Sequence, residues 1–204
     1  MIRNIVFDMG NVIIRFDPLW FMDKEGIMDP ADRQLVMREL FQSVEWALMD
    51  RGDLTEQTAE PRILPRIPDR LKESVRRLLY QWADERDGIE GMEDLVRQLK
   101  EAGYGVYLLS NASVAQPAYW TRYPASRYFD GTLISAEVRR IKPMDEIYRI
   151  FLDRFRLRGE ECVFVDDLSA NVAAAVANGW QGIVFHGDVA ELKEGLRTLG
   201  VNAG

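Results

Sequence analysis

The chain has 204 residues, of which 47% are hydrophobic and 29% are charged, and its formal net charge at pH 7 is −7. This length suits one large domain or a domain with an insertion, and no apolar run approaches the roughly 20 residues that a membrane helix needs. The acidic balance argues against nucleic acid as a partner, because nucleic-acid phosphates attract a basic surface.

Cysteine and histidine each occur once, as Cys162 and His186. An intramolecular disulfide is therefore excluded, and so are zinc sites built from cysteines or from several histidines. The N-terminal apolar stretch is too short for a secretory signal peptide. We therefore expect a cytoplasmic globular protein whose chemistry depends on carboxylates.

The first predicted element is a strand at residues 2–8, where the run Ile5-Val6-Phe7 is typical of a strand buried on both faces. The segment that follows, residues 18–86, has helical periodicity and no convincing strand. We interpret it as an all-helical insertion placed directly after the first strand.

Within this insertion, Asp29 and Pro30 are expected to begin a helix, as its capping residue and its first-turn proline. That helix is expected to continue to Gly52, because apolar residues recur on one face. These residues are Leu35, Val36, Leu40, Phe41, Val44 and Leu48. After a stretch interrupted by three prolines, a further helix is predicted at residues 71–82.

After the insertion, short apolar runs predict more strands, at residues 105–109, 162–165 and 182–185, with a weaker one at 132–134. Amphipathic helices are predicted between them. Their ranges are residues 92–101, 146–155 and 169–177. Strands that alternate with helices of this length indicate an α/β fold, a doubly wound parallel sheet with helices on both faces.

Ligands of open α/β sheets bind beyond the carboxyl ends of the strands, and several polar side chains of this sequence follow predicted strands. They are Asp8 and Asn11 after the first strand, Ser110 and Asn111 after the second, Asp166, Asp167 and Asn171 after the fourth, and Lys142 before a helix. Taken singly, each is most often a turn, cap or solvated residue. The adjacent carboxylates Asp166 and Asp167, however, would repel each other unless a cation or a lysine offset them.

In this chain order, four segments resemble the four motifs of the haloacid dehalogenase-like superfamily. They read Phe7-Asp8-Met9-Gly10-Asn11-Val12, Leu109-Ser110-Asn111, Ile141-Lys142-Pro143 and Phe164-Val165-Asp166-Asp167. The resemblance spans essentially the whole chain. It implies a Rossmann-like core at residues 1–16 and 87–204 and a helical cap at residues 17–86. The first motif is most similar to that of small bacterial phosphatases with such a cap, including one that acts on α-glucose 1-phosphate.

The resemblance implies a magnesium-dependent phosphatase in which Asp8 attacks phosphorus and forms an aspartyl-phosphate. Its implied Mg²⁺ ligands are Asp8, Asp167 and the main-chain carbonyl of Gly10, with Asp166 behind them or at an additional metal position. Ser110 and the backbone N–H of Asn111 would bind the phosphoryl group, and Lys142 would neutralise it. The expected partner is a small phosphorylated metabolite, with a sugar phosphate favoured, and neither nucleic acid nor a membrane. The expected state is a monomer or a weak homodimer, and the sequence shows no unexplained apolar face that would decide between them.

One position departs from the family pattern. Phosphate-ester hydrolases of this superfamily usually carry a second aspartate two residues after the nucleophile, which protonates the leaving group and then activates water. Here that position is Gly10. Such an acid–base group is commonly worth about 10²–10⁴-fold in rate. Two explanations are open: a substrate with an acidic leaving group, such as an anomeric sugar hydroxyl, or a replacement acid from Asp17, Asp50 or Asp53.

The cap is expected to select the substrate, because it would cover the site and exclude water. The candidates to face the pocket are Trp46, Asp50 and Asp53. A place in the cap core is the competing interpretation for Trp46, since it extends the apolar stripe. Three further aromatic residues could stack on a sugar ring or serve in the core: Trp20, Tyr119 and Trp120.

Four other functions remain as alternatives. A metal-independent 2-haloacid dehalogenase shares the fold and the nucleophile, but the pair Asp166-Asp167 argues against it, and sensitivity to EDTA would discriminate. A sugar-phosphate mutase depends on the acid that Gly10 replaces. A phosphoacceptor receiver domain carries its acidic pair early in the chain and has no cap. A non-catalytic protein that binds a phosphorylated ligand is compatible with Gly10, but gives no reason for the other motif residues to be kept together.

Overall fold

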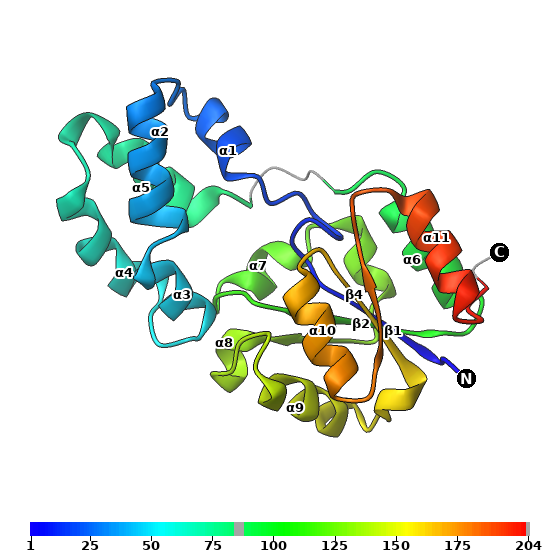
Figure 1. Ribbon diagram of the computed structural model, residues 1–204. Helices are drawn as coiled ribbons and strands as arrows, with labels where there is room; N and C mark the ends of the chain where they lie inside the picture. The colour runs from blue at the N-terminus through cyan, green and yellow to red at the C-terminus, as the bar shows by residue number, and fades with distance from the viewer. Residues whose placement is uncertain (84–87, 203–204) are drawn as a thin grey trace.

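The computed structural model describes residues 1–83 and 88–202, and within these ranges five parallel strands form one sheet (Figure 1). The strands are β1 (Asn4–Phe7), β2 (Gly105–Ser110), β3 (Gly131–Ile134), β4 (Cys162–Asp166) and β5 (Gln181–Val184). Their order is β3-β2-β1-β4-β5, so the first strand of the chain lies in the centre, and all four of its residues are buried. The predicted doubly wound α/β fold is confirmed.

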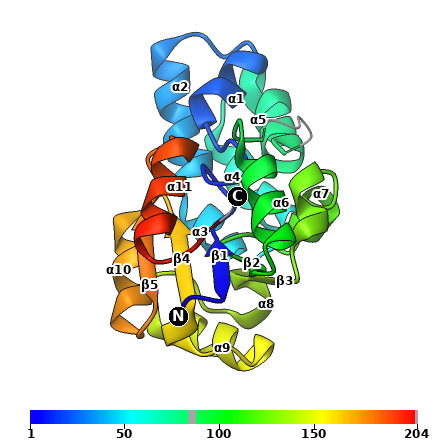
Figure 2. The same ribbon diagram turned by 90° about the vertical axis from the view of Figure 1, so that its right-hand side faces the viewer.

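Helices cover both faces of the sheet because alternate residues of β1 point to opposite sides. On one side Ile5 and Phe7 pack with α6 (Met92–Glu101) and α11 (Val189–Thr198) in one apolar cluster. On the other side Val6 packs with α9 (Asp145–Phe155) and α10 (Ser169–Ala177) in a second cluster. Figures 1 and 2 show these two helix layers. The predicted bounds of α6 and α10 are those of the structure, and α9 begins one residue earlier than predicted.

Short elements that the sequence did not reveal connect these units. They are α7 (Gln116–Trp120), α8 (Ser135–Val138) and the 3₁₀ turns η3 (Pro124–Tyr128) and η4 (Gly159–Glu161). In the described parts of the chain, no helix combines the length and the apolar character that crossing a membrane requires.

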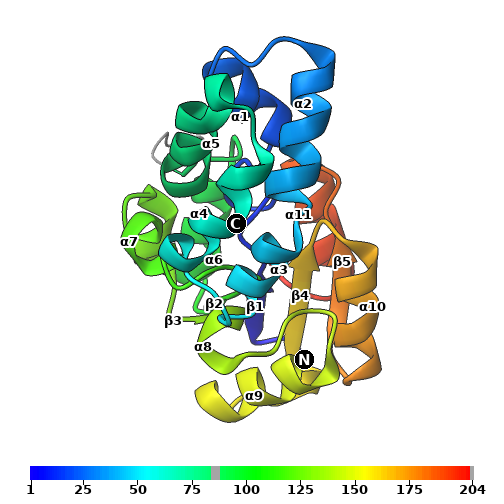
Figure 3. The ribbon, with the colours of Figure 1, turned by 90° about the vertical axis from the view of Figure 1, so that its left-hand side faces the viewer.

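The inserted segment forms a helical unit with its own apolar core (Figures 1 and 3). Its elements are α1 (Pro18–Lys24), α2 (Pro30–Val36), the π-helical turn η1 (Met37–Phe41), α3 (Val44–Asp50), α4 (Glu56–Ile63), the 3₁₀ turn η2 (Leu64–Arg66) and α5 (Asp69–Gln81). Asp29 caps α2 as expected, since its side chain accepts hydrogen bonds from the backbone of Ala31 and Asp32. The expected end of the cap at residue 86 lies outside the described residues.

The prediction of one helix from Pro30 to Gly52 is wrong. The chain leaves α2 through η1 and starts again at Ser43, whose hydroxyl accepts a hydrogen bond from the backbone N–H of Trp46 at 3.1 Å. Val44, assigned to the apolar stripe, is 66% exposed. Apolar periodicity does not reveal a capping serine, and here Ser43 begins a new helix inside the apolar stripe.

The C-terminal end of α3 docks on the core beside α8 (Figure 3). Gly52 follows α3 with φ +77°, and a Cβ atom at this position would overlap the carbonyl oxygen of Ala136. Ser135 also donates a hydrogen bond from Oγ to the backbone carbonyl of Asp50. The Ser135 hydrogen bond and the close approach of Gly52 to Ala136, which only a glycine permits, therefore hold the cap against the core.

Replacing Gly52 with alanine is expected to destabilise the protein by about 1–3 kcal/mol more than replacing Gly26, and to lower its activity. Gly26 is the matched control because it has φ +72° in the same cap, but a Cβ atom there would meet no other atom within 4 Å. Both variants carry the left-handed backbone strain, roughly 1–2 kcal/mol, and only Gly52→Ala adds the clash with Ala136. Urea unfolding of both variants measures the difference, and equal losses would show that this contact does not hold the cap.

Candidate active site

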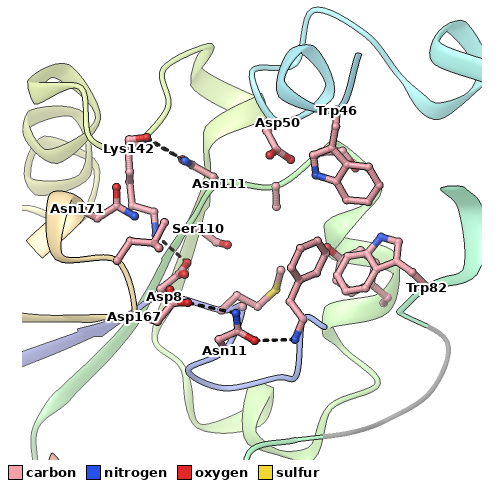
Figure 4. A pocket seen from close by; sticks show the side chains of 17 residues that line it. Asp8, Asn11, Trp46, Asp50, Trp82, Ser110, Asn111, Lys142, Asp167 and Asn171 are labelled. Atoms are coloured by element: carbon pink, nitrogen blue, oxygen red, sulfur yellow. Dashed lines mark hydrogen bonds and ion pairs between the residues drawn. The ribbon is translucent and has the colours of Figure 1, made fainter. Parts of the chain in front are cut away.

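A cavity of about 360 Å³ lies between the cap and the carboxyl ends of the central strands (Figure 4). Its core side is formed by residues that follow β1, β2 and β4, together with Lys142. Its cap side is formed by Trp46 and Asp50 of α3 and by Phe16 and Trp82 at the two ends of the cap. This is the position that the topology of an open parallel sheet favours for a ligand.

Lys142 lies at the floor of the cavity, and its side chain is 1% exposed. Its Nζ is 2.7 Å from Oδ1 of Asp8 and 2.7 Å from Oδ2 of Asp166, and it donates a hydrogen bond to the carbonyl of Leu109 at 3.0 Å. Burial opposes the charge of this ammonium group, but the two carboxylates outweigh it, so the pKa of Lys142 is raised. One buried cation therefore orients two buried carboxylates.

Asp8 follows β1 directly, and its backbone N–H donates to the carbonyl of Val165 at 2.8 Å, which fixes its position at the sheet edge. Burial and the nearby charge of Asp166 raise the pKa of the Asp8 carboxyl to about 6, against the opposing effect of Lys142. At neutral pH this carboxylate is ionised and only partly compensated, which suits a group that attacks an electrophile.

Asp166 and Asn171 form the support behind Lys142. Oδ1 of Asp166 accepts hydrogen bonds from the backbone of Leu168 at 2.8 Å and from Nδ2 of Asn171 at 3.1 Å. Oδ2 accepts from Nζ of Lys142 and again from Asn171, at 2.7 and 3.1 Å. The Asp166 side chain has no exposed surface. Oδ2 of Asp166 thus orients Lys142, Leu168 and Asn171 hold the Asp166 carboxylate in place, and the carboxyl of Asp167 lies at the cavity.

Carboxylate oxygens of Asp8, Asp166 and Asp167 all lie within 4.8 Å of one another. Burial raises the pKa of Asp167, and its Oδ2 accepts a hydrogen bond from Nδ2 of Asn11 at 3.2 Å. Such a donor set of oxygens without nitrogen or sulfur fits a hard divalent cation such as Mg²⁺. Gly10 also lines the cavity.

Ser110 is the last residue of β2 and Asn111 follows it, and both line the cavity. The Asn111 side chain also bridges the backbone of Lys142: Oδ1 accepts from the Lys142 N–H at 2.8 Å, and Nδ2 donates to the Lys142 carbonyl at 3.0 Å. Sequence reasoning considered only the backbone N–H of Asn111. The side-chain bridge joins segments 31 residues apart, which no local pattern reveals.

Of the cap residues proposed to face the pocket, some line the cavity in the structure and others do not. Trp46 lines the cavity and also packs on Phe41 at a ring distance of 5.1 Å, so it belongs both to the cap core and to the cavity wall. Asp50 lines the cavity, whereas Asp53 is exposed, pairs with Arg51 and is not among the lining residues. Asp17 caps α1 through hydrogen bonds to the backbone of its first turn.

Sequence reasoning missed two aromatic residues of the wall, Phe16 and Trp82, whose rings are 5.0 Å apart. Tyr119, a candidate for stacking, does line the cavity and lies 5.3 Å from Trp82. Trp20 and Trp120 do not line it. Phe16 and Trp82 stand next to the ends of the cap, so their position at the mouth could have been inferred from the domain boundaries.

Comparisons with known proteins agree with this arrangement. A family model described as haloacid dehalogenase-like hydrolase matches residues 2–179. A sesquiterpene phosphatase of Aspergillus oryzae is 27% identical, with 97% of this chain and 96% of the relative covered. A D-ribitol-5-phosphate phosphatase of Bacteroides thetaiotaomicron is 27% identical, with 84% of this chain and 86% of the relative covered. Among solved structures, a haloacid dehalogenase family enzyme from Bacteroides thetaiotaomicron, in complex with magnesium and inorganic phosphate, superposes with a TM-score of 0.72 at 20% identity. The superposition covers 94% of this chain and 99% of that enzyme.

Proposed function

The chain belongs to the haloacid dehalogenase-like hydrolases, and from that premise we propose that it is a magnesium-dependent phosphomonoesterase acting on a small phosphorylated metabolite, a sugar phosphate by preference. The observation that carries this proposal is the buried Lys142 between Asp8 and Asp166 at the floor of the cavity between cap and core. Two relatives that match most of the chain are named as phosphatases, and one of them acts on a sugar-alcohol phosphate.

Asp8 is the proposed nucleophile. Its carboxylate needs no deprotonation near neutral pH, and Lys142 holds one of its oxygens at 2.7 Å, so the other oxygen is left to form the bond to phosphorus. That bond gives an aspartyl-phosphate, and hydrolysis of the aspartyl-phosphate returns the carboxylate and releases phosphate.

Lys142, Ser110 and the Asn111 N–H would bind the phosphoryl oxygens. Lys142 is already oriented by Asp166 and by the Asn111 side chain, so little reorganisation accompanies binding. Preorganised donors in a site with little water stabilise developing charge more strongly than water does.

Asp8, Asp167 and the carbonyl of Gly10 would hold the Mg²⁺ ion, with Asp166 behind them. When bound, the ion would offset the negative charges of the carboxylates and of the phosphate. The aromatic side chains on the cap side offer flat apolar surfaces against which the ring of a sugar can stack. A cavity of about 360 Å³ accommodates a metabolite of that size.

Removal of divalent cations is expected to abolish phosphate release, and added Mg²⁺ is expected to restore it. The measurement is inorganic phosphate released from a panel of sugar phosphates, nucleotides and phosphoglycolate, with EDTA and then with excess Mg²⁺. Full turnover in EDTA would contradict the metal requirement. Release of halide from 2-haloacids without metal, together with inactivity on every phosphate ester, would favour the dehalogenase alternative.

A further inference from the structure

Cleavage of an alkyl phosphate leaves an alkoxide oxygen, which needs a proton as the P–O bond breaks. No carboxyl group among the described residues on the core side of the cavity is a suitable donor for it. Tyr119 also lines the cavity, but burial raises the pKa of its hydroxyl, so it is a weak acid. Asp8 is the nucleophile, Asp167 faces the acidic cluster, and position 10 has no side chain. Lys142 is held by two carboxylates that keep its proton in place.

Asp50 faces the cavity from the opposite side (Figure 4). It is the last residue of α3, is half-buried, and lies across the cavity from Asp8 and Lys142. Within residues 1–83 and 88–202, no hydrogen bond or ion pair engages its carboxyl group, although Asp17, Asp53 and Asp167 all have such partners. The Asp50 carboxyl is therefore available to a ligand.

The backbone of Asp50 is fixed although its carboxyl group is not. Its carbonyl accepts a hydrogen bond from Ser135, and Gly52 lies directly against the backbone of Ala136. These contacts tie the end of α3 to α8, the short helix that follows β3 in the core. A residue of the cap is thus placed with the accuracy of a core residue, as a proton donor requires.

The surroundings of Asp50 favour its protonated form. Burial and the charges of Asp8 and Glu56 raise the pKa of its carboxyl to about 7, against the opposing charge of Lys142. The other ionisable group that interacts with it is Tyr119 of α7. Glu56 itself accepts a hydrogen bond from Ser113 Oγ at 2.5 Å, which leaves Asp50 as the carboxyl group without a partner on this side of the described cavity. A carboxylic acid that titrates near neutral pH can both give and take a proton.

We propose that Asp50 is the general acid of the reaction, protonating the leaving-group oxygen from the cap in place of a side chain at position 10. This inference rests on the proposed phosphomonoesterase function. It selects one of the explanations that the sequence left open, a replacement acid in the cap. Asp17 and Asp53 do not fill this role, because one caps α1 and the other lies outside the cavity.

The two steps balance. In the first, Asp8 Oδ forms a bond to phosphorus, the bond from phosphorus to the leaving oxygen breaks with its electron pair on that oxygen, and Asp50 supplies the proton that makes an alcohol. In the second, the Asp50 carboxylate takes a proton from water as the water oxygen bonds to phosphorus. The bond from phosphorus to Asp8 breaks, phosphate leaves, and both residues return to their starting states.

The test compares Asp50→Asn with the wild type on two substrates, p-nitrophenyl phosphate and the sugar phosphate that the wild type hydrolyses fastest. Nitrophenolate leaves readily without a proton, whereas a sugar alkoxide does not. We expect kcat/KM, which reports the steps up to formation of the aspartyl-phosphate, to fall in Asp50→Asn by about 10²–10⁴-fold on the sugar phosphate and by less than about tenfold on p-nitrophenyl phosphate. The inhibition constant of inorganic phosphate should stay unchanged, because Asp50 is not needed to bind it.

The pH profile gives a second readout. A general acid acts only while protonated, so wild-type kcat/KM on the sugar phosphate should fall as pH rises through the pKa of Asp50, about 7, and Asp50→Asn should lose this dependence. Asp50→Glu keeps an acid and should recover part of the sugar-phosphate activity. The matched control is Asp69→Asn, which removes one carboxylate from the exposed start of α5 and should retain the wild-type profile.

Equal loss of kcat/KM on both substrates, or an unchanged pH profile of kcat/KM in Asp50→Asn, would overturn the assignment of the acid while the phosphatase proposal stood. Hydrolysis of neither phosphate ester by the wild type in excess Mg²⁺ would overturn the proposed function, and the role of Asp50 with it.

Discussion

Asp8→Asn is expected to reduce turnover by on the order of 10⁴-fold or more, because the amide cannot form the covalent bond to phosphorus that the proposed mechanism requires. The substitution keeps the shape of the side chain. It removes a charge that the surroundings disfavour, since they raise the pKa of this carboxyl to about 6, so we expect the variant to fold. Lys142 keeps its second partner, Asp166.

Phosphate release under saturating substrate measures the loss, and circular dichroism with a cooperative thermal transition shows that the variant is folded. Denaturing acid trapping of the wild type with ³²P-labelled substrate should give a labelled protein, and Asp8→Asn should give none. Turnover within tenfold of wild type in a folded Asp8→Asn sample would contradict the mechanism.

Lys142→Met is expected to produce the largest loss of stability. The substitution leaves two buried carboxylates, those of Asp8 and Asp166, without the cation between them. Removing one partner of a buried ion pair typically costs about 3–5 kcal/mol, because the remaining charge is neither solvated nor paired. The variant should also be inactive, since the phosphoryl group loses its cationic partner.

Urea unfolding in EDTA measures the free energy of unfolding for this comparison. Lys100→Met is the matched control, since Lys100 pairs with Asp130 on the surface and both side chains are about a third exposed. A surface pair is worth about 0–1 kcal/mol. The double variant Lys142→Met with Asp166→Asn should recover part of the lost stability, because one uncompensated charge is removed. A loss for Lys142→Met no greater than that for Lys100→Met would show that the buried cation is not needed for folding.

Much of the fold could be predicted because the strands of a parallel sheet are buried on both faces and therefore appear as short apolar runs. Helices α6 and α10 have the predicted bounds for a related reason, since glycines 103 and 179 follow them closely and have positive φ. The helices of the cap were harder to predict, because the path of the chain there depends on Ser43, a single capping residue inside a stretch with apolar periodicity. Helix α8 has only four residues, too few for a periodic pattern.

The residues of the candidate site likewise divide into those that the sequence predicts and those that it does not. Residues placed directly after strands, such as Asp8 and Ser110, are brought together by topology alone, so their positions at one edge could be predicted. The side chain of Asn111 and the aromatic pair Phe16 and Trp82 depend on contacts between segments far apart in sequence. No period or spacing encodes such contacts, and only the folded chain reveals which of the possible cap acids reaches the cavity.

The central position of β1 has a consequence for the order of folding. Asn4 pairs with Gly105 on one side and with Cys162 on the other, so the sheet cannot close around β1 until most of the chain is available. The contacts inside the cap, by contrast, join residues of one continuous segment. Local contacts form faster than distant ones because they close shorter loops. On a ribosome, the inserted unit therefore has all its residues before its host does, and β1, although made first, cannot pair on both sides until Cys162–Asp166 has been made.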